Sequence, residues 1–335
     1  MKLATYRNGQ PDGRLMVVSR DLARVVDAGA VAPNLLHALQ HWDEAAPRLQ
    51  RLADAINGGA DIADTASAEA FDPARCMAPL PRTFQWCDAS AFLNHGRLME
   101  RAFNTPPIQD FDTIPVMYQG ASDDFLGPCD LVPMPDEALG IDFEGEFGVV
   151  SGPVPMGATP EAAARAIRLV VQLNDWSLRA LAGREARSGF GFLQAKPSTS
   201  FAPVAVTPDE LGEGWRDGRV QLELEVTWNE ERFGHPHGGE MHYSFGELLA
   251  HAARTRKLSA GTIVGSGTVS NAGGERGSAC ITERRVIEML EQGRPVTEFM
   301  RFGDRVRMCA RSASGEAPFG AIEQRVVQAA PVEPA

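Results

Sequence analysis

The sequence has 335 residues, enough for one large and one small domain, and its 44% hydrophobic and 23% charged residues are ordinary for a globular protein. Its 32 Lys and Arg against 44 Asp and Glu give a net charge of −12, which repels phosphate backbones and anionic lipids, so we expect neither nucleic acid nor membrane as a partner. The start has no signal-like apolar run and the five scattered cysteines form no Cys-x-x-Cys pair, so we expect a cytoplasmic protein without disulfides.

Residues 1–80 are predicted to be a small N-terminal domain with its linker. Residues 15–19 are a strand candidate. Residues 35–56 carry apolar side chains at helical spacing, with a break or kink expected at Pro47. Residues 57–81 are rich in Gly, Ala, Asp and Pro, which is typical of a linker.

Residues 81–330 are predicted to be a larger second domain built mostly from strands. Residues 220–228 alternate apolar and polar side chains, the period of a half-buried strand. Thr159-Pro160-Glu161 supplies a cap, a first-turn proline and an acid, which predicts a helix ending near Leu173. The predicted fold class is therefore mainly β with peripheral helices (α+β). The other predicted strands are 262–268, 304–310 and 321–327, and the second predicted helix is 245–257.

The segment Asp142 to Phe147 is the most informative for chemistry. As a strand, it places Asp142, Glu144 and Glu146 on one face. One interpretation is a solvated strand with its acids outward. The other is a site for a hard divalent cation such as Mg²⁺ or Ca²⁺, because neighbouring carboxylates raise one another's pKa unless a positive charge lies between them. The pattern by itself leaves both open.

Further candidates for such a site come from other segments. Asp175 follows the predicted helix directly, and a carboxylate at a helix C-terminus needs an offsetting cation, either Arg179 or a metal. Asp88 is another candidate ligand, although an Asp in a loop is more often a turn or cap residue. His95, seven residues after Asp88, would suit a general base near a metal. Residues 265–270 lack a dinucleotide or P-loop pattern and predict a tight turn or an anion-facing backbone.

Taken in order, these motifs resemble the fumarylacetoacetate hydrolase family, and its fumarylacetoacetases more than its shorter members. The resemblance covers roughly residues 80–327 and rests on the shared order and spacing rather than on one motif. The matching positions are Asp88 and His95, Tyr118 in Pro-Val-Met-Tyr, Glu144 and Glu146, Asn174, Asp175, Ser177 and Arg179, Lys196, Gly267 and Thr268, and Glu283.

The resemblance implies a β-roll catalytic domain in a homodimer. It implies hydrolysis of a carbon–carbon bond in a small 1,3-diketo acid, with fumarylacetoacetate of tyrosine breakdown, cut to fumarate and acetoacetate, as the first candidate. It also implies one Mg²⁺ or Ca²⁺ ion held by Asp88, Glu144, Glu146 and Asp175.

The family's residue roles carry over to this chain position by position. The resemblance makes His95 the general base and Glu283 the group that orients it. Lys196 would stabilise developing negative charge. The substrate's oxygens would be held by Tyr118, Arg179 and Thr268.

This chain departs from the family pattern in two places. After Arg179 it reads Ala-Leu-Ala-Gly-Arg, where the fumarylacetoacetases carry an acid and then a glutamine. The family's substrate-binding arginine near His95 has no clean equivalent, although Arg97 and Arg101 are close by. Both departures concern substrate recognition. The alternatives are therefore another reaction of the family, such as acylpyruvate hydrolysis or 2-oxo acid hydration or decarboxylation, or a catalytically silent binding protein of this fold.

Overall fold

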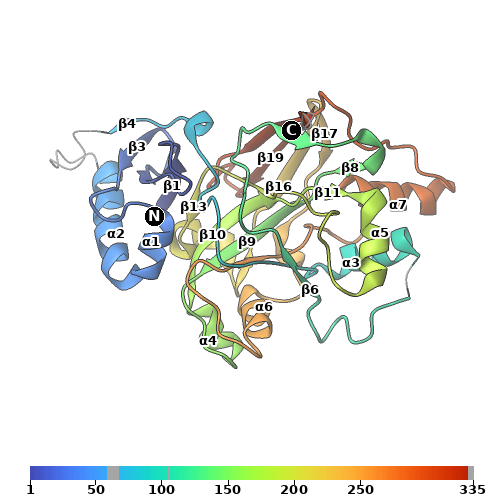
Figure 1. The fold of residues 1–335 in the computed structure, drawn as a ribbon, viewed down its shortest axis with the longest axis horizontal. Coiled ribbons are helices and arrows are strands. Elements are labelled where there is room, and N and C mark those ends of the chain that lie inside the picture. Colours follow the sequence, from blue (N-terminus) through green and yellow to red (C-terminus); the bar gives the residue numbers. More distant parts are fainter. Residues whose placement is uncertain (59–67, 105, 331–335) are drawn as a thin grey trace, which may run out of the picture.

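Two stacked β-sheets with helices around them form the structure, a computed structural model that describes residues 1–58, 68–104 and 106–330 (Figure 1). The larger sheet begins in the N-terminal unit and continues into the rest of the chain, because β1 pairs with β13, with Lys2 opposite Val206. Its strand order in the described residues is β4 (Glu69–Ala70), β3 (Arg24–Asp27), β2 (Arg14–Val18), β1 (Lys2–Tyr6), β13 (Ala205–Val206), β10 (Ile167–Asn174), β9 (Gly145–Ser151), β18 (Ile263–Gly265), β5 (Trp86–Ala89) and β6 (Met117–Gly120), with β12 (Ser200–Phe201) also beside β10.

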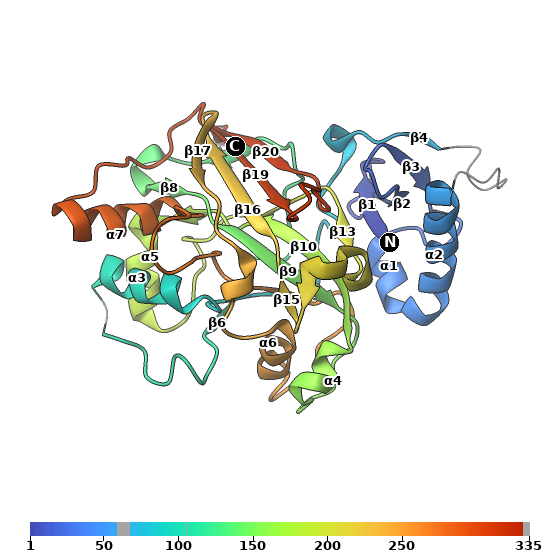
Figure 2. The same cartoon turned by 180° about the vertical axis from the view of Figure 1, so that it is seen from behind.

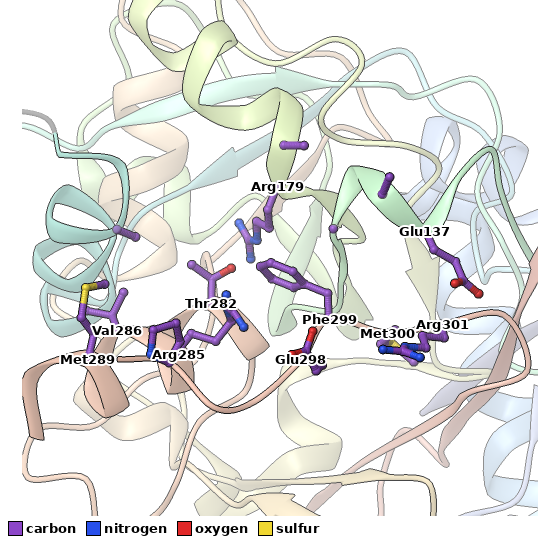
Figure 3. Close-up of a pocket in the computed structure, with 15 residues that line it drawn as sticks. Glu137, Arg179, Thr282, Arg285, Val286, Met289, Glu298, Phe299, Met300 and Arg301 are labelled. Carbon is purple, nitrogen blue, oxygen red and sulfur yellow. The ribbon is translucent and has the colours of Figure 1, made fainter. Parts of the chain in front are cut away.

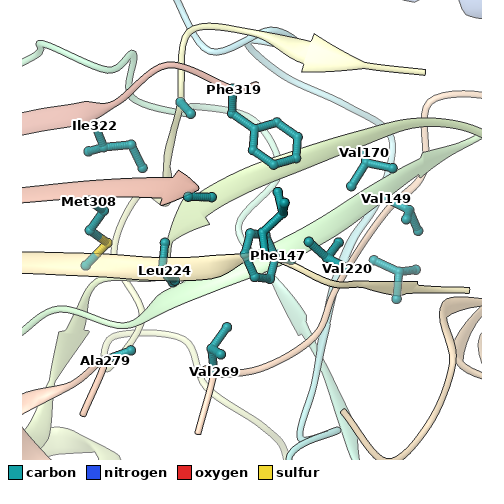
Figure 4. Close-up of a cluster of buried hydrophobic side chains, with 14 of the residues drawn as sticks. Phe147, Val149, Val170, Val220, Leu224, Val269, Ala279, Met308, Phe319 and Ile322 are labelled. Carbon is teal, nitrogen blue, oxygen red and sulfur yellow. The ribbon is translucent and has the colours of Figure 1, made fainter. Parts of the chain in front are cut away.

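The second sheet packs against one face of the first. Figure 4 shows the side chains between the layers, from Phe147, Val149 and Val170 on one side and Leu224, Met308 and Ile322 on the other. Burying each such side chain contributes about 1.5–3 kcal/mol, so this core holds the layers together. The second sheet runs β17 (Glu231–Gly234), β16 (Glu223–Trp228), β19 (Arg305–Arg311), β20 (Ile322–Gln328) and β7 (Val132–Met134), and the small pairs are β8 (Ile141–Asp142) with β11 (Ser177–Leu178) and β14 (Trp215–Arg216) with β15 (Arg219–Val220).

Strands β9 and β10 are buried on both faces. Because successive strand residues point to opposite faces, Val149 and Val170 enter the core between the sheets. Val150 and Val171 enter a second core beneath the N-terminal unit. The N-terminal unit therefore both extends the sheet and covers its other face. The helices over the second core are α1 (Leu35–Gln40) and α2 (Trp42–Gly58).

The other helices surround the C-terminal part of the molecule. In both views α3, α5 and α7 gather at the end away from the N-terminal unit, and α4 lies beside α6 (Figures 1 and 2). The first group brings helices from distant parts of the sequence to one end of the sheet. The bounds are α3 (Leu93–Phe103), α4 (Pro160–Ala164), α5 (Arg179–Ser188), α6 (Phe245–Ala252) and α7 (Ile281–Gln292).

The predicted fold class, mainly β with peripheral helices, is confirmed. Strand predictions correspond to β2, β18, β19 and β20, residues 220–228 divide into β15 and β16, and the predicted helix 245–257 is the shorter α6. Of the predicted linker 57–81, residues 59–67 lie outside the described residues.

The prediction of a helix from Thr159 to about Leu173 was wrong beyond its first turns. Thr159 does cap α4, accepting a hydrogen bond from the Ala162 N–H at 3.3 Å. The helix ends at Ala164, and the chain then forms β10. The apolar, β-branched run of β10 fits a central strand that is buried on both faces. Asp175 therefore follows a strand and does not face a helix C-terminus.

The predicted break at Pro47 lies instead at His41. His41 leaves the helical region (φ −123°, ψ 38°) and ends α1, and α2 then continues through Pro47. Pro47 removes one backbone donor, but Leu49 and Ala53 beyond it pack in the second core. The apolar face of α2 therefore outweighs the lost hydrogen bond.

In the turn after β18, replacing Gly267 by alanine should destabilise the fold. Gly267 has a φ of +75°, and a Cβ there would collide with the Ala89 carbonyl oxygen. Gly273 has a φ of +92° but open space around it. Gly267→Ala should therefore lower the free energy of unfolding by about 2 kcal/mol more than Gly273→Ala, since both variants share the left-handed strain of roughly 1–2 kcal/mol. Urea unfolding of the two variants measures this, and equal losses would contradict it.

Candidate active site

Three carboxylates from neighbouring strands meet at one end of the larger sheet. Asp88 lies in β5, Glu146 in β9, and Asp175 directly after β10. One oxygen of each lies within 4.8 Å of the others, and all three residues are buried. The register of the sheet thus brings together acids that are 87 positions apart in the chain.

These three carboxylates differ in the number of hydrogen bonds that they accept. Asp88 accepts the Gly267 N–H at 3.0 Å. Asp175 accepts the Thr199 hydroxyl at 2.8 Å and also a short hydrogen bond from the Tyr118 hydroxyl. Both carboxylate oxygens of Glu146 are buried without a hydrogen-bond partner. A carboxylate in that position needs either a proton or a cation.

Burial shifts the acidities in the direction expected for carboxyls without a cation. Burial and then the charge of Asp175 raise the pKa of Asp88 to about 8. Burial and then the charge of Asp88 raise the pKa of Glu146 well above its ordinary value. Without a cation, the cluster therefore retains protons that free carboxyl groups would lose.

Glu144 lies outside this cluster and is held by two cations. It forms an ion pair with Lys196 at 2.6 Å and a second one with Arg179. Burial opposes ionisation, but Lys196 and then Arg179 lower the pKa of Glu144 below its ordinary value. Lys196 also reaches Asp175 at 2.7 Å, so its ammonium group links Glu144 to the carboxylate cluster.

Asp142 does not face the cluster either, contrary to the prediction of one acidic strand face. Strand β8 ends at Asp142 and β9 starts only at Gly145. The Asp142 carboxylate accepts the N–H groups of Ile281 and Thr282 at 2.7 and 2.9 Å, at the N-terminus of α7. There it offsets the positive end of the helix dipole.

Arg179 ties these acids together. Its Nε donates to Asp142 at 2.8 Å, while a terminal nitrogen donates to Glu144. Figure 3 shows the Arg179 side chain directed towards Thr282 and Phe299, which line a cavity of about 580 Å³. The guanidinium of Arg179 is thus already shared between two buried carboxylates.

His95 and Glu283 form a buried pair between α3 and α7. His95 Nδ1 lies 3.0 Å from Glu283 Oε2. Cys280 caps α7, with its sulfur accepting the Glu283 N–H at 3.3 Å, which fixes the start of the helix. The sequence-based pairing of His95 with Glu283, 188 positions later, is thus matched by direct contact.

A cavity of about 370 Å³ reaches both the carboxylates and His95. Thr268 also lines it, and its hydroxyl is buried without a partner. Of the predicted site residues, the cavity is lined by Asp88, His95, Tyr118, Glu144, Arg179, Lys196 and Thr268, whereas Glu146 and Asp175 lie behind this surface and Glu283 lies behind His95.

Three further groups shape the site, and only the Gly267 backbone had been given a possible role from the sequence, as a donor to an anion. Thr199 and the Gly267 backbone N–H bind the cluster carboxylates, and Asn174 accepts the Glu144 N–H at 2.9 Å. Asn174 belongs to a motif noted in the sequence, but no role was assigned to it there. Nothing in the residues around Thr199 singles out Thr199. The roles of Thr199 and Asn174 depend on pairings between distant strands.

The comparisons with known proteins agree with this architecture. The family model "Fumarylacetoacetate (FAA) hydrolase C-terminal" matches residues 85–327, and "Fumarylacetoacetase N-terminal domain 2" matches residues 1–82. The chain belongs to the fumarylacetoacetate hydrolase family. A curated relative, the 2,4-didehydro-3-deoxy-L-rhamnonate hydrolase of Sphingomonas sp. (strain SKA58), is 26% identical over 204 residues, which are 58% of this chain and 69% of the relative.

Solved structures share the fold over nearly the whole chain. The fumarylacetoacetate hydrolase of Exiguobacterium antarcticum is 18% identical with a TM-score of 0.65, over 98% of this chain and 99% of that one. The maleylpyruvate hydrolase of Sphingobium sp. SYK-6, in complex with manganese (II) ion and pyruvate, is 17% identical with a TM-score of 0.64, over 98% and 100%. At these identities the likeness establishes the fold. Within the described ranges, no helix is both long and apolar enough to cross a membrane.

The raised pKa values predict how stability depends on pH when a chelator is present. A carboxyl whose pKa is higher in the folded state binds its proton more tightly there, so stability falls as pH rises towards the folded pKa. Between pH 5 and 8, the free energy of unfolding should fall by about 1.4 kcal/mol per pH unit through Asp88 alone, and the raised pKa of Glu146 acts in the same direction. Urea titrations in EDTA measure this slope. Asp88→Asn should flatten it, and an equal slope in both proteins would contradict the assignment.

Proposed function

We propose that the protein is a divalent-metal-dependent hydrolase that cleaves a carbon–carbon bond in a 1,3-diketo acid. The observation that carries the proposal is the buried Glu146 carboxylate, whose two oxygens have no partner, beside Asp88 and Asp175. The surrounding charges support it, because five buried carboxylates share two largely buried cations, Lys196 and Arg179. The carboxylates are Asp88, Asp142, Glu144, Glu146 and Asp175.

The donor set fits a hard divalent ion. Asp88, Glu146 and Asp175 would hold it through carboxylate oxygens, the ligands that Mg²⁺, Ca²⁺ and Mn²⁺ take. A protein of the same fold, the Sphingobium maleylpyruvate hydrolase, has been solved in complex with manganese (II) ion, which supports the proposal of a divalent metal. When bound, such an ion polarises the oxygens of a β-dicarbonyl group and lowers the energy of the enolate that leaves. Mg²⁺ or Ca²⁺ is the proposed native ion.

His95 is the proposed general base. Its Nδ1–H donates to Glu283, which fixes the tautomer and leaves Nε2 free to take a proton from water. The resulting hydroxide attacks the carbonyl carbon, the adjacent carbon–carbon bond breaks, and the departing enolate takes up the proton. One molecule of water is thus consumed for each bond cut.

The remaining polar groups bind and stabilise negative charge. The Lys196 ammonium, buried beside Glu144 and Asp175, is positioned to stabilise charge on a substrate oxygen in a site sheltered from water. Tyr118 and the unpartnered Thr268 hydroxyl line the same cavity and would donate to substrate oxygens. Arg179 also lines the cavity, and we assign it mainly to holding Glu144 in place.

Several diketo acids satisfy this chemistry. Fumarylacetoacetate is the substrate that the sequence resemblance implies, and the match to the fumarylacetoacetase N-terminal model supports it. Ultraviolet assays of the purified protein, with Mg²⁺ or with EDTA, should show metal-dependent loss of a diketo acid among fumarylacetoacetate, acetylpyruvate and oxaloacetate. If every diketo acid tested survives with metal present, the proposal fails. We also propose that the enzyme is cytoplasmic and forms a homodimer. Light scattering of the purified protein tests the number of subunits.

The two glutamates of the Glu-Gly-Glu motif should differ in their effect on metal. Glu146→Gln removes a cluster ligand and should weaken Mn²⁺ binding, followed by titration calorimetry, at least about a hundredfold, with loss of activity. Glu144→Gln keeps the three cluster carboxylates and should weaken binding by less than tenfold. The outcome that would overturn the three-carboxylate assignment is an equal loss in both variants.

Replacing the proposed base, His95, should lower the turnover rate without weakening metal binding. His95→Ala should lower kcat on the order of a hundredfold or more and leave the Mn²⁺ affinity unchanged, because His95 binds Glu283 and not the cluster. Glu283→Gln should also lower kcat, by less, through loss of orientation. Unchanged kcat in His95→Ala would remove this residue from the mechanism.

A further inference from the structure

The catalytic cavity has two chemically different ends. The inner end carries the cluster carboxylate Asp88 together with His95, Lys196 and Thr268. The outer end is formed by apolar side chains from α3, from the loop after it, from the stretch up to β6, and from α5 and the loop that follows it. These apolar residues are Met99, Ile108, Phe111, Val116, Met117, Ala182, Ala186 and Phe192.

The aromatic side chains at the outer end pack against α3 and Tyr118. A Cβ at Gly96 would collide with the Phe111 ring, so the glycine lets this ring lie directly against α3. Phe192 packs edge-to-face on Tyr118, with ring centroids 5.1 Å apart. Ala182 and Ala186, one turn apart on α5, contribute only methyl groups to the cavity. The space in front of them is therefore left for the substrate.

Among the described residues that line this cavity, every cation is already paired. Lys196 lies between Glu144 and Asp175, and Arg179 lies between Asp142 and Glu144. The charged group at the outer end is Glu100, whose carboxylate accepts the Ile108 N–H at 3.0 Å.

Arg97 and Arg101 do not fill this gap. Arg97 lines an adjoining hollow of about 170 Å³, which shares Glu100, Ile108 and Phe111 with the cavity and is also lined by the acids Asp110 and Asp112. Arg101 is exposed on α3 and lines neither cavity.

We propose that the substrate's acyl group beyond the cleaved bond is apolar and uncharged, so that the enzyme acts on monocarboxylic 1,3-diketo acids such as alkyl- or arylacyl pyruvates. This inference rests on the proposed function. A second carboxylate at the far end, as in fumarylacetoacetate, would lie among the partly exposed side chains of Met99, Phe111 and Phe192, beside the Glu100 carboxylate and with no unpaired cation among the described residues that line the cavity.

The unaltered metal-loaded enzyme provides the first test. Crotonylpyruvate and fumarylpyruvate differ only by a methyl group in place of the far carboxylate. We expect kcat/KM to favour crotonylpyruvate at least tenfold. In the series from acetyl- to butyrylpyruvate, it should rise about fourfold for each CH₂ that becomes buried.

The outcomes separate this inference from the proposed function. Turnover of fumarylpyruvate as fast as crotonylpyruvate, or a flat series, would overturn the apolar subsite and leave the hydrolase intact. No metal-dependent turnover of any of these diketo acids would overturn both.

A charge placed in the wall should reverse the preference. Ala186→Arg, at an exposed position of α5 that faces the cavity, should raise the ratio of kcat/KM for fumarylpyruvate over crotonylpyruvate at least tenfold. Met99→Arg on the opposite wall should do the same if the first variant misfolds. The control is Met156→Arg, which adds the same charge at a 65% exposed position outside the cavity and should leave the ratio unchanged. An unchanged ratio in both folded wall variants would overturn the proposal.

Discussion

The rest of the site depends on the excess of negative charge at one end of the larger sheet. Parallel and antiparallel pairings of β5, β18, β9 and β10 place Asp88, Glu146 and Asp175 together at a buried position. Two cations can balance only part of the buried charge, and both already bridge pairs of acids. Repulsion between these carboxylates and their desolvation oppose folding, which is why we propose that the cluster binds a cation.

The carboxylates at this end of the larger sheet are removed from water only because both faces of the sheet are covered. The second sheet covers one face of β9 and β10, and the N-terminal unit covers the other. The N-terminal unit contributes none of the predicted site residues, yet its pairing of β1 with β13 closes the core beneath the strands that carry Glu146 and Asp175. Its part in the chemistry is therefore indirect, through exclusion of water.

Helices and strands divide the chemistry between them. The strand ends supply the proposed oxygen ligands, whose positions are fixed by the backbone ladder. The proposed general base, His95, and its partner Glu283 come from α3 and α7, which meet at the same end of the sheet, and Asp142 fixes the start of α7 by accepting its first N–H groups. Arg179, bound to Asp142 and Glu144, connects the start of α7 to the carboxylates.

The sequence by itself determined the family, the strands with period-two alternation, and the residues that gather at the site, because motif order and side-chain chemistry are local. It misplaced the strand after Ala164, since helix-start residues predict where a helix begins and not where a buried sheet takes over. Only the tertiary structure decided that Glu144 is paired with cations while Glu146 is left without a partner, although the two are separated by a single glycine. It alone also decided that Phe111 and Phe192 face a cavity in which the described residues offer no unpaired cation, because such charge balance depends on contacts between distant segments.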